Sequence, residues 1–187
     1  MLLGYAIESI TGMSHADFIH TEFALPLGLI DTGVCGTNNL PVPEGYGVFI
    51  NGTNGTTWVR LPSLHKTVVW SSGSLCSTAS DLARWSHLLA TGHAMLPDSY
   101  ATMTTPARLE NNTVVPNRYA LGVGVQNILG HPAVAHDGAI DGFQSFLVYF
   151  SSQEIAVAVV TNAFPAPASG NPVTIAIAVA KAALAVP

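Results

Sequence analysis

The sequence predicts an α+β fold in which an antiparallel sheet is backed by helices. Helical periodicity covers residues 2–25 and returns over 78–92, β-rich runs follow one another in the last third, and an Ala-rich segment from Val173 closes the chain. Helices followed by strands that are adjacent in sequence are typical of this class. The length of 187 residues fits one domain, residues 1–187, with a core of its own.

The first two helices are defined by their ends. A helix is expected over residues 2–11, because Gly12 is a natural C-cap and the apolar residues recur on one face: Leu2, Leu3, Ala6, Ile7 and Ile10. A second helix begins after Ser14, since Asp17 completes a capping-box pattern, and Pro26 ends it.

The middle of the chain is poor in regular structure. Residues 27–75 are rich in Gly, Pro, Asn and Thr and predict loops with short strands, such as Tyr46–Ile50 and Thr67–Trp70. A capping box at Thr78 and Asp81 then starts a helix that ends near Gly92. A shorter helical segment is expected at Pro97–Met103.

The last third has the period of strands. Three β-rich runs are expected, at Tyr119–Gln126, Phe143–Phe150 and Ile155–Thr161. The second and third are joined by the polar residues 151–154, which indicates an antiparallel hairpin.

Composition excludes several classes of protein. Hydrophobic residues make up 49% and charged residues 9%, the reverse of a disordered chain. The net charge is −5 without a basic cluster, so we expect no nucleic-acid partner. No apolar run reaches the length of about 20 residues that a membrane span needs. The first residues contain neither a basic segment nor a cleavage site, so we expect no signal peptide there.

Metal, cofactor and disulfide chemistry is not indicated. Cys35 and Cys76 are too few for a zinc site, and we expect two buried free thiols, with pairing in an oxidising compartment as the alternative. The histidine pairs are five residues apart and do not share a helical face. Residues 122–124 (Gly-Val-Gly) lack the helix that a dinucleotide fingerprint needs. We therefore expect no metal and no cofactor.

The segment His136-Asp137-Gly138 is the polar group most suggestive of chemistry. Gly138 lets a ligand or a second backbone approach closely because it has no Cβ, and His136 can exchange a proton near neutral pH. Taken alone, the triplet is interpreted as a Gly-rich connection with a surface histidine.

Seven ordered segments change this interpretation. Together they resemble the serine β-lactamase and penicillin-binding-protein-like superfamily, in the branch of class C β-lactamases, D-alanyl-D-alanine carboxypeptidases, D-aminopeptidases and esterases. The segments are Leu2-Leu3-Gly4-Tyr5-Ala6-Ile7-Glu8 with Thr11-Gly12, Pro26-Leu27-Gly28-Leu29 with Asp31-Thr32-Gly33, Gly73 to Trp85, Tyr119 to Gly124, His136-Asp137-Gly138, Gly142-Phe143-Gln144-Ser145 and Thr161-Asn162.

The resemblance implies a nucleophilic mechanism. In the family a Ser-x-x-Lys helix and a Tyr-x-Asn motif handle the nucleophile and its proton, and a Lys-Thr-Gly or His-x-Gly strand forms the opposite wall. Here His136-Asp137-Gly138 matches that third motif, and the backbone N–H of Ala139 takes the place of an oxyanion-hole donor. The first two motifs are expected upstream of Met1, so the chain corresponds to the C-terminal portion and lacks the N-terminal strands and the nucleophile helix.

Two local matches are interpreted as chance. Ser63-Leu64-His65-Lys66 has the letters of Ser-x-x-Lys, but the following residues are β-branched and make a poor helix. Tyr149-Phe150-Ser151 ends a predicted strand. A serine nucleophile at Ser63 in a rearranged fold is the third hypothesis.

The resemblance implies a hydrolase function, and one alternative function stays open. The parent protein is expected to hydrolyse a small-molecule or peptide acyl substrate, first an ester or D-amino-acid peptide and second a β-lactam, whereas the chain alone is expected to be inactive. The rival is a non-catalytic homologue that binds peptidoglycan-like peptides or a partner chain. Because the missing strands would border residues 155–161, an exposed edge and self-association are expected. The family is often exported.

Overall fold

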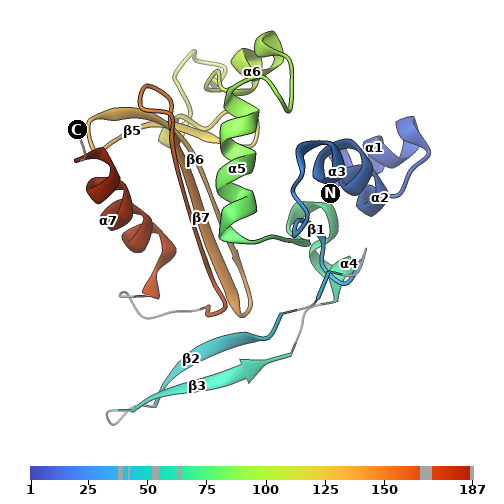
Figure 1. Cartoon of the computed structure of the whole chain (residues 1–187), viewed down its shortest axis with the longest axis vertical. Helices are drawn as coiled ribbons and strands as arrows, with labels where there is room; N and C mark the ends of the chain where they lie inside the picture. The colour runs from blue at the N-terminus through green and yellow to red at the C-terminus, as the bar shows by residue number, and fades with distance from the viewer. Residues whose placement is uncertain (38–39, 42, 52–54, 63–64, 165–169, 186–187) are drawn as a thin grey trace.

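A four-stranded antiparallel sheet forms the centre of the computed structural model, which describes residues 1–37, 40–41, 43–51, 55–62, 65–164 and 170–185. The strands lie in the order β5 (Gly124–Ile128), β6 (His131–Ile140), β7 (Phe143–Phe150) and β8 (Ile155–Thr161). Figure 1 shows α5 (Ala79–Ala90) on one face of the sheet and α7 (Pro172–Leu184) on the other. The predicted α+β class is confirmed.

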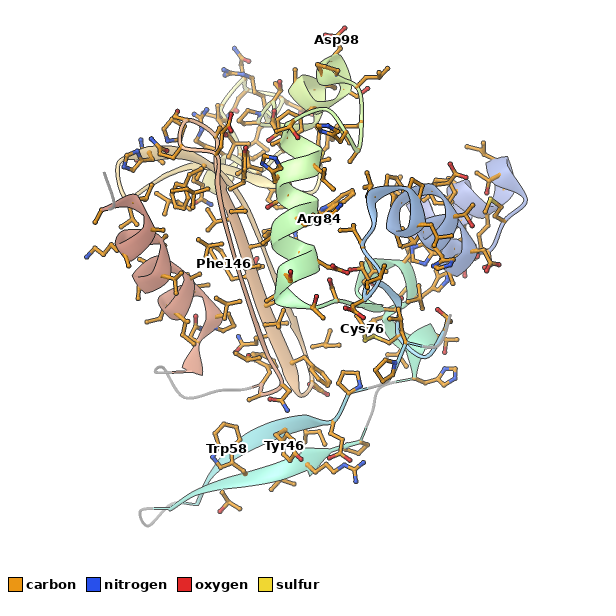
Figure 2. All side chains as sticks on the ribbon, in the orientation of Figure 1. Tyr46, Trp58, Cys76, Arg84, Asp98 and Phe146 are labelled. Carbon is orange, nitrogen blue, oxygen red and sulfur yellow. A yellow bond between two sulfur atoms is a disulfide. The ribbon has the colours of Figure 1, made fainter. Side chains whose placement is uncertain are left out.

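The main core lies between the sheet and α7. Alternate residues of β6, β7 and β8 face this helix, as the strand period requires, and Phe146 belongs to this layer (Figure 2). Ala176 and Ala180 are fully buried on the helix side, and such small side chains let the helix lie close to the strands. The buried set is Ala133, Ala135, Phe146, Val148, Phe150, Val157, Ala176 and Ala180.

The predicted hairpin β7–β8 and the helix α7 are confirmed, but two neighbouring interpretations are wrong. β5 begins at Gly124 and not at Tyr119, because Ala120 N–H donates to the Val123 carbonyl at 2.7 Å and Gly122 has a φ of 82° in a turn. The triplet from His136 to Gly138 is not a loop connection: it lies inside β6, paired with β7.

The helices at the start of the chain follow their predicted caps. α1 (Leu2–Thr11) ends at Gly12 with a φ of 70°, and α2 (His15–Ile19) begins with the Asp17 N–H donating to Ser14 Oγ at 3.1 Å. The expected stop at Pro26 is wrong. The chain continues through the π-helical turn η1 (His20–Ala24) into α3 (Leu25–Leu27). Pro26 stands in the first turn of α3, a position at which the N–H that proline lacks is tolerated.

Helix α1 packs through its smallest residue. A Cβ at the buried Gly4 would lie 2.5 Å from Ser71 Cβ, and the Tyr5 ring lies 4.5 Å from that of Trp70. The larger apolar side chains of the helix face outward, with Leu2 85% and Leu3 81% exposed. This is an apolar surface of the kind expected for part of a larger fold.

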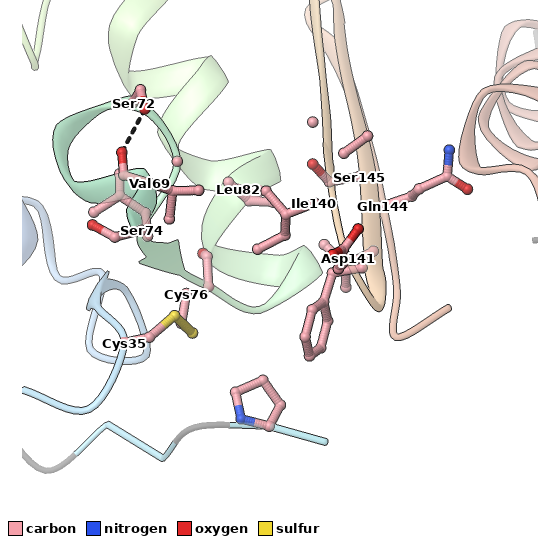
Figure 3. Close-up of a pocket in the computed structure, with 18 of the residues that line it drawn as sticks. Cys35, Val69, Ser72, Ser74, Cys76, Leu82, Ile140, Asp141, Gln144 and Ser145 are labelled. Atoms are coloured by element: carbon pink, nitrogen blue, oxygen red, sulfur yellow. Dashed lines mark hydrogen bonds between the residues drawn. A yellow bond between two sulfur atoms is a disulfide. The ribbon is translucent and has the colours of Figure 1, made fainter. Parts of the chain in front are cut away.

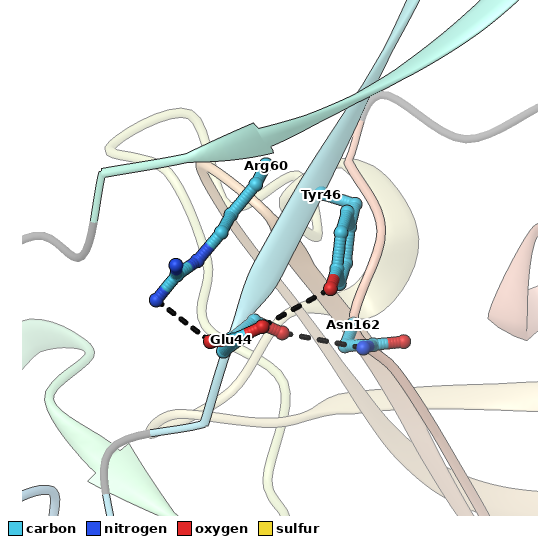
Figure 4. Close-up of polar contacts among 4 residues, drawn as sticks. All are labelled: Glu44, Tyr46, Arg60 and Asn162. Atoms are coloured by element: carbon cyan, nitrogen blue, oxygen red, sulfur yellow. Dashed lines mark hydrogen bonds and ion pairs between the residues drawn. The ribbon is translucent and has the colours of Figure 1, made fainter.

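The hairpin of β2 (Gly45–Asn51) and β3 (Gly55–Leu61) extends from the sheet at its lower end (Figure 1). Its root is fixed by backbone hydrogen bonds on Tyr46, whose N–H donates to Asn162 and whose carbonyl accepts from Phe164, both at 2.9 Å. Glu44 accepts from Arg60 at 2.7 Å and from the Tyr46 hydroxyl at 3.1 Å (Figure 4). The predicted strand at 46–50 is confirmed.

The predicted strand at Thr67–Trp70 is wrong. These residues fall in α4 (Lys66–Val69) and the 3₁₀ turn η2 (Trp70–Ser72), and the Thr67 hydroxyl is hydrogen-bonded to His65 Nδ1 at 2.8 Å just before the turn. The strand propensity of β-branched residues is a weak determinant over so short a segment, and local hydrogen bonds override it. The helix α6 (Pro97–Met103) is confirmed, and a 3₁₀ turn, η3 (Pro116–Arg118), precedes β5.

The expectation of two free thiols is also wrong, because Cys35 and Cys76 form a disulfide. The strands β1 (Gly33–Val34) and β4 (Leu75–Cys76) pair antiparallel, and Cys35 N–H donates to the Ser74 carbonyl at 3.0 Å. This pairing brings the two Cα atoms to 5.1 Å, within the range of disulfide geometry.

Strand β8 is the last in its sheet order and pairs with β7 alone among the described strands. Val160 on this strand is 42% exposed. The edge that the sequence led us to expect is therefore present. In the part of the chain that the structure covers, none of the helices is both long and apolar enough to cross a membrane.

Reduction of the disulfide is expected to lower the free energy of unfolding by about 4 kcal/mol. The intact bond closes a loop between cysteines 41 residues apart and thereby restricts the unfolded chain. Urea unfolding with and without a phosphine reductant measures the change. A Cys35→Ser/Cys76→Ser double variant is the control and should not respond to reductant. Equal midpoints for the oxidised and reduced wild-type chain would contradict the pairing.

Candidate functional site

A cleft of about 800 Å³ opens between the lower end of the sheet and the segment that contains η2 and β4 (Figure 3). One wall is formed by residues 136–145 of β6 and β7, and the other by residues 69–77. Leu82 in the first turns of α5 also lines it, as does Cys35 after β1. Segments that are far apart in sequence therefore converge on one concave surface.

The sheet wall exists because β6 is longer than β5. β5 pairs only with residues 131–135 of β6, whereas β7 pairs with β6 from Ala133 through Ile140. Residues 136–140 therefore have a strand on one side only. Every second residue of this stretch directs its N–H and C=O to the open side, where they lack a ladder partner among the described strands. His136, Gly138 and Ala139, the three site residues named from sequence, all lie on this open edge and line the cleft.

His136 is the residue of this edge that makes a side-chain hydrogen bond to a distant part of the chain. Its side chain is exposed, and its Nε2 lies 3.0 Å from the hydroxyl of Tyr119 in the turn that precedes β5. The two rings have their centroids 6.1 Å apart. In the sequence, Tyr119 stands out only as the start of a β-rich run and of a family segment, and nothing in the 16 residues between the two side chains indicates the contact.

Gly138 is restricted by its neighbour on β7. It stands opposite Ser145, and a Cβ at Gly138 would lie 2.7 Å from Ser145 Oγ. The missing Cβ thus leaves room for a side chain of the cleft wall as well as for a ligand, which refines the sequence interpretation.

The opposite wall is held by the carboxylate of Asp81, which is 8% exposed. Its Oδ2 accepts from the Asp31 N–H and from the Thr32 hydroxyl, both at 2.9 Å. Thr32 Oγ1 lies 2.7 Å from Ser77 Oγ. One buried acceptor therefore joins the segment before β1 to the start of α5, beside the disulfide. The sequence indicated Asp81 as a capping residue only.

Two residues of the cleft lining carry buried polar atoms, His15 Nδ1 and Ser74 Oγ, that have no hydrogen-bond partner among the described residues. The His15 ring packs edge-on against Trp70 at 5.9 Å, and Trp70 has a φ of 33°, a strained value for a large side chain. Burial lowers the pKa of His15, which the Glu8 carboxylate partly offsets. His15 is therefore neutral at neutral pH.

Comparison with known proteins decides the family. The family described as Beta-lactamase matches residues 1–182. The chain belongs to the β-lactamase family.

Curated relatives in the family include penicillin-binding protein 4* of Bacillus subtilis, 29% identical over 163 residues, and unguisins hydrolase ungD' of Aspergillus campestris, 26% identical over 172 residues. The alignments cover 80% and 87% of this chain but 35% and 31% of those proteins. The chain thus spans about a third of the length of these relatives.

Solved structures show the same β-lactamase-family fold. The D-amino acid amidase of Ochrobactrum anthropi superposes with a TM-score of 0.78 at 19% identity, covering 98% of this chain and 56% of that one. The octameric penicillin-binding protein homologue of Pyrococcus abyssi gives 0.77 at 22% identity, covering 98% and 40%. Only about half of such a fold is present in these 187 residues.

Several serines but no lysine are among the described residues that line the cleft. Ser63 of the local Ser-x-x-Lys match lies outside the described residues. The residues that follow it form only the four-residue helix α4, in which Val68 is 56% exposed, unlike a buried nucleophile helix. Tyr149 is 4% exposed in the core. Within the described residues, no three His, Cys, Asp or Glu side chains are arranged to hold a metal ion.

The variant Asp81→Ala is expected to lower the free energy of unfolding by about 2 kcal/mol, because it removes a buried charged acceptor from two part-buried hydrogen bonds. Asp98→Ala is the matched control, since Asp98 is an exposed acid in the first turn of α6. Urea unfolding of both variants makes the comparison. A difference between them below about 0.5 kcal/mol would mean that Asp81 does not fasten this wall.

Proposed function

We propose that this chain provides one wall of the active-site cleft of a serine hydrolase that works through an acyl-enzyme. The nucleophilic serine, its lysine and the motif tyrosine belong, in this proposal, to polypeptide outside these 187 residues. The chain alone is therefore inactive. The observation that carries the proposal is the open edge of residues 136–140 on the cleft, in a chain of the β-lactamase family.

Three residues of the edge have a role in this proposal. The Ala139 N–H is one oxyanion-hole donor, which stabilises the charge that develops on the carbonyl oxygen of the substrate. Gly138 lets the acyl group approach the strand, and His136 donates a hydrogen bond or a proton beside it. The open side of a strand suits this chemistry because its unpaired N–H groups have fixed directions.

The proposed substrate class is supported by proteins of the same fold. We infer hydrolysis of an ester or of an amide of a D-amino acid, with β-lactams as the second class. Two proteins of the same fold are described as a D-amino acid amidase and a D-stereospecific amidohydrolase, the latter with a TM-score of 0.75 at 21% identity. The Cys35–Cys76 disulfide agrees with an exported parent protein, since disulfides persist in oxidising compartments.

The second candidate is a non-catalytic homologue that binds peptidoglycan-like peptides or a partner chain. It is favoured by one observation, the cleft without a Ser-Lys pair among the described residues. In that case D-Ala-D-Ala peptides bind saturably to the chain and are not turned over.

The intact mass of the purified chain, before and after a fluorophosphonate and a penicillin, tests the proposal. We expect no adduct with either reagent, whereas a D-amino acid amidase of the family, treated in parallel, serves as the positive control. A stoichiometric adduct would place a nucleophilic serine inside these 187 residues and contradict the proposal. Ser63→Ala would then be the first variant to map it.

A further inference from the structure

We propose that Tyr119 is a positioning residue that holds His136 in the tautomer protonated on Nδ1. His136 then presents a neutral N–H donor to the cleft, suited to the carbonyl oxygen of an uncharged ester or amide. The statement about the ligand rests on the proposed function, whereas the statement about the tautomer rests on the contact between the two side chains.

The direction of the hydrogen bond follows, in this proposal, from the acidity of the two groups. Tyr119 Oη and His136 Nε2 lie 3.0 Å apart, with the ring planes inclined at 53°. In a neutral imidazole one nitrogen donates and the other accepts, and a phenol hydroxyl is a stronger donor than an imidazole N–H. The stable arrangement therefore has the tyrosine hydroxyl donating to Nε2, which leaves the proton of the ring on Nδ1.

The backbone fixes Tyr119 on both sides. Its carbonyl accepts from the Ala107 N–H at 2.9 Å, and the next residues are held by the bonds from Ala120 N–H to Val123 and from Leu121 N–H to Met103, at 2.7 and 3.0 Å. Arg118 Nε donates to the Val125 carbonyl at 3.1 Å. The hydroxyl thus comes from a tied turn, while His136 stands in a paired strand.

In the described part of the chain, Asp137 and Asp141 line the cleft together with His136. No acidic side chain there forms an ion pair with His136, and no hydrogen bond is made to its Nδ1. An uncharged donor at this place favours a neutral carbonyl oxygen, whereas a fixed cation would favour a carboxylate.

Long-range ¹H–¹⁵N correlation spectra of the uniformly ¹⁵N-labelled chain at pH 8 read the tautomer directly. In the wild-type chain we expect Nε2 of His136 to resonate in the acceptor range and Nδ1 in the donor range. The His136→Gln variant assigns the signals. In Tyr119→Phe, which removes only the hydroxyl, we expect Nε2 to shift to the donor range, because free histidine prefers the Nε2–H form.

Tyr5→Phe is the matched control, since Tyr5 is a 62% exposed tyrosine on α1, and it should leave the His136 signals unchanged. Unchanged nitrogen chemical shifts of His136 in Tyr119→Phe would overturn the proposal. An Nε2–H form of His136 in the wild-type chain would also overturn it, and this measurement does not depend on the folding of the variant. Binding of an N-acetyl-D-phenylalanine amide, compared with the matching free acid, tests the ligand separately. A tautomer change with a preference for the acid would contradict the ligand assignment alone.

Discussion

The difference in length between two neighbouring strands determines what this molecule can present to a ligand. β6 has ten residues and β5 has five, so half of β6 is left with one partner. That half is held by β7, which pairs with it up to the two-residue turn of Asp141 and Gly142, and α7 packs its alanines against the adjacent strands. An edge that is otherwise a risk for aggregation is thereby held in one place beside a cleft.

The facing wall depends on different forces. Residues 31–35 and 74–81 touch through a two-residue strand pair, which is too short to be stable by itself. A covalent bond between Cys35 and Cys76 and the buried carboxylate of Asp81 make up for the short ladder. Within the described residues the cleft therefore has one wall built by a sheet and one built by cross-links. About half of the fold of its relatives is absent, which agrees with the exposed apolar side of α1.

The parts of the fold that the sequence predicted are those with local signals. Ser14 and Thr78 mark helix starts by their capping chemistry, and the runs at 143–150 and 155–161 match β7 and β8 residue for residue. The residue pattern alone did not predict β6, because His136, Asp137 and Gly138 interrupt its apolar residues; a strand was expected there only from the family resemblance. The Cys35–Cys76 bond and the Tyr119–His136 contact join positions whose proximity no local pattern encodes. The site triplet itself came from the order of family segments and not from its own composition.

Hydrogen exchange of the 187-residue chain, followed by mass spectrometry, tests most directly whether the cleft wall exists before any further polypeptide is added. We expect slow exchange in peptides from β7, residues 143–150, which is paired on both sides, and rapid exchange in α1 and in the amides on the open side of 136–140. Rapid exchange throughout β6, β7 and β8 would contradict this expectation, because the wall would then not be formed by this chain alone.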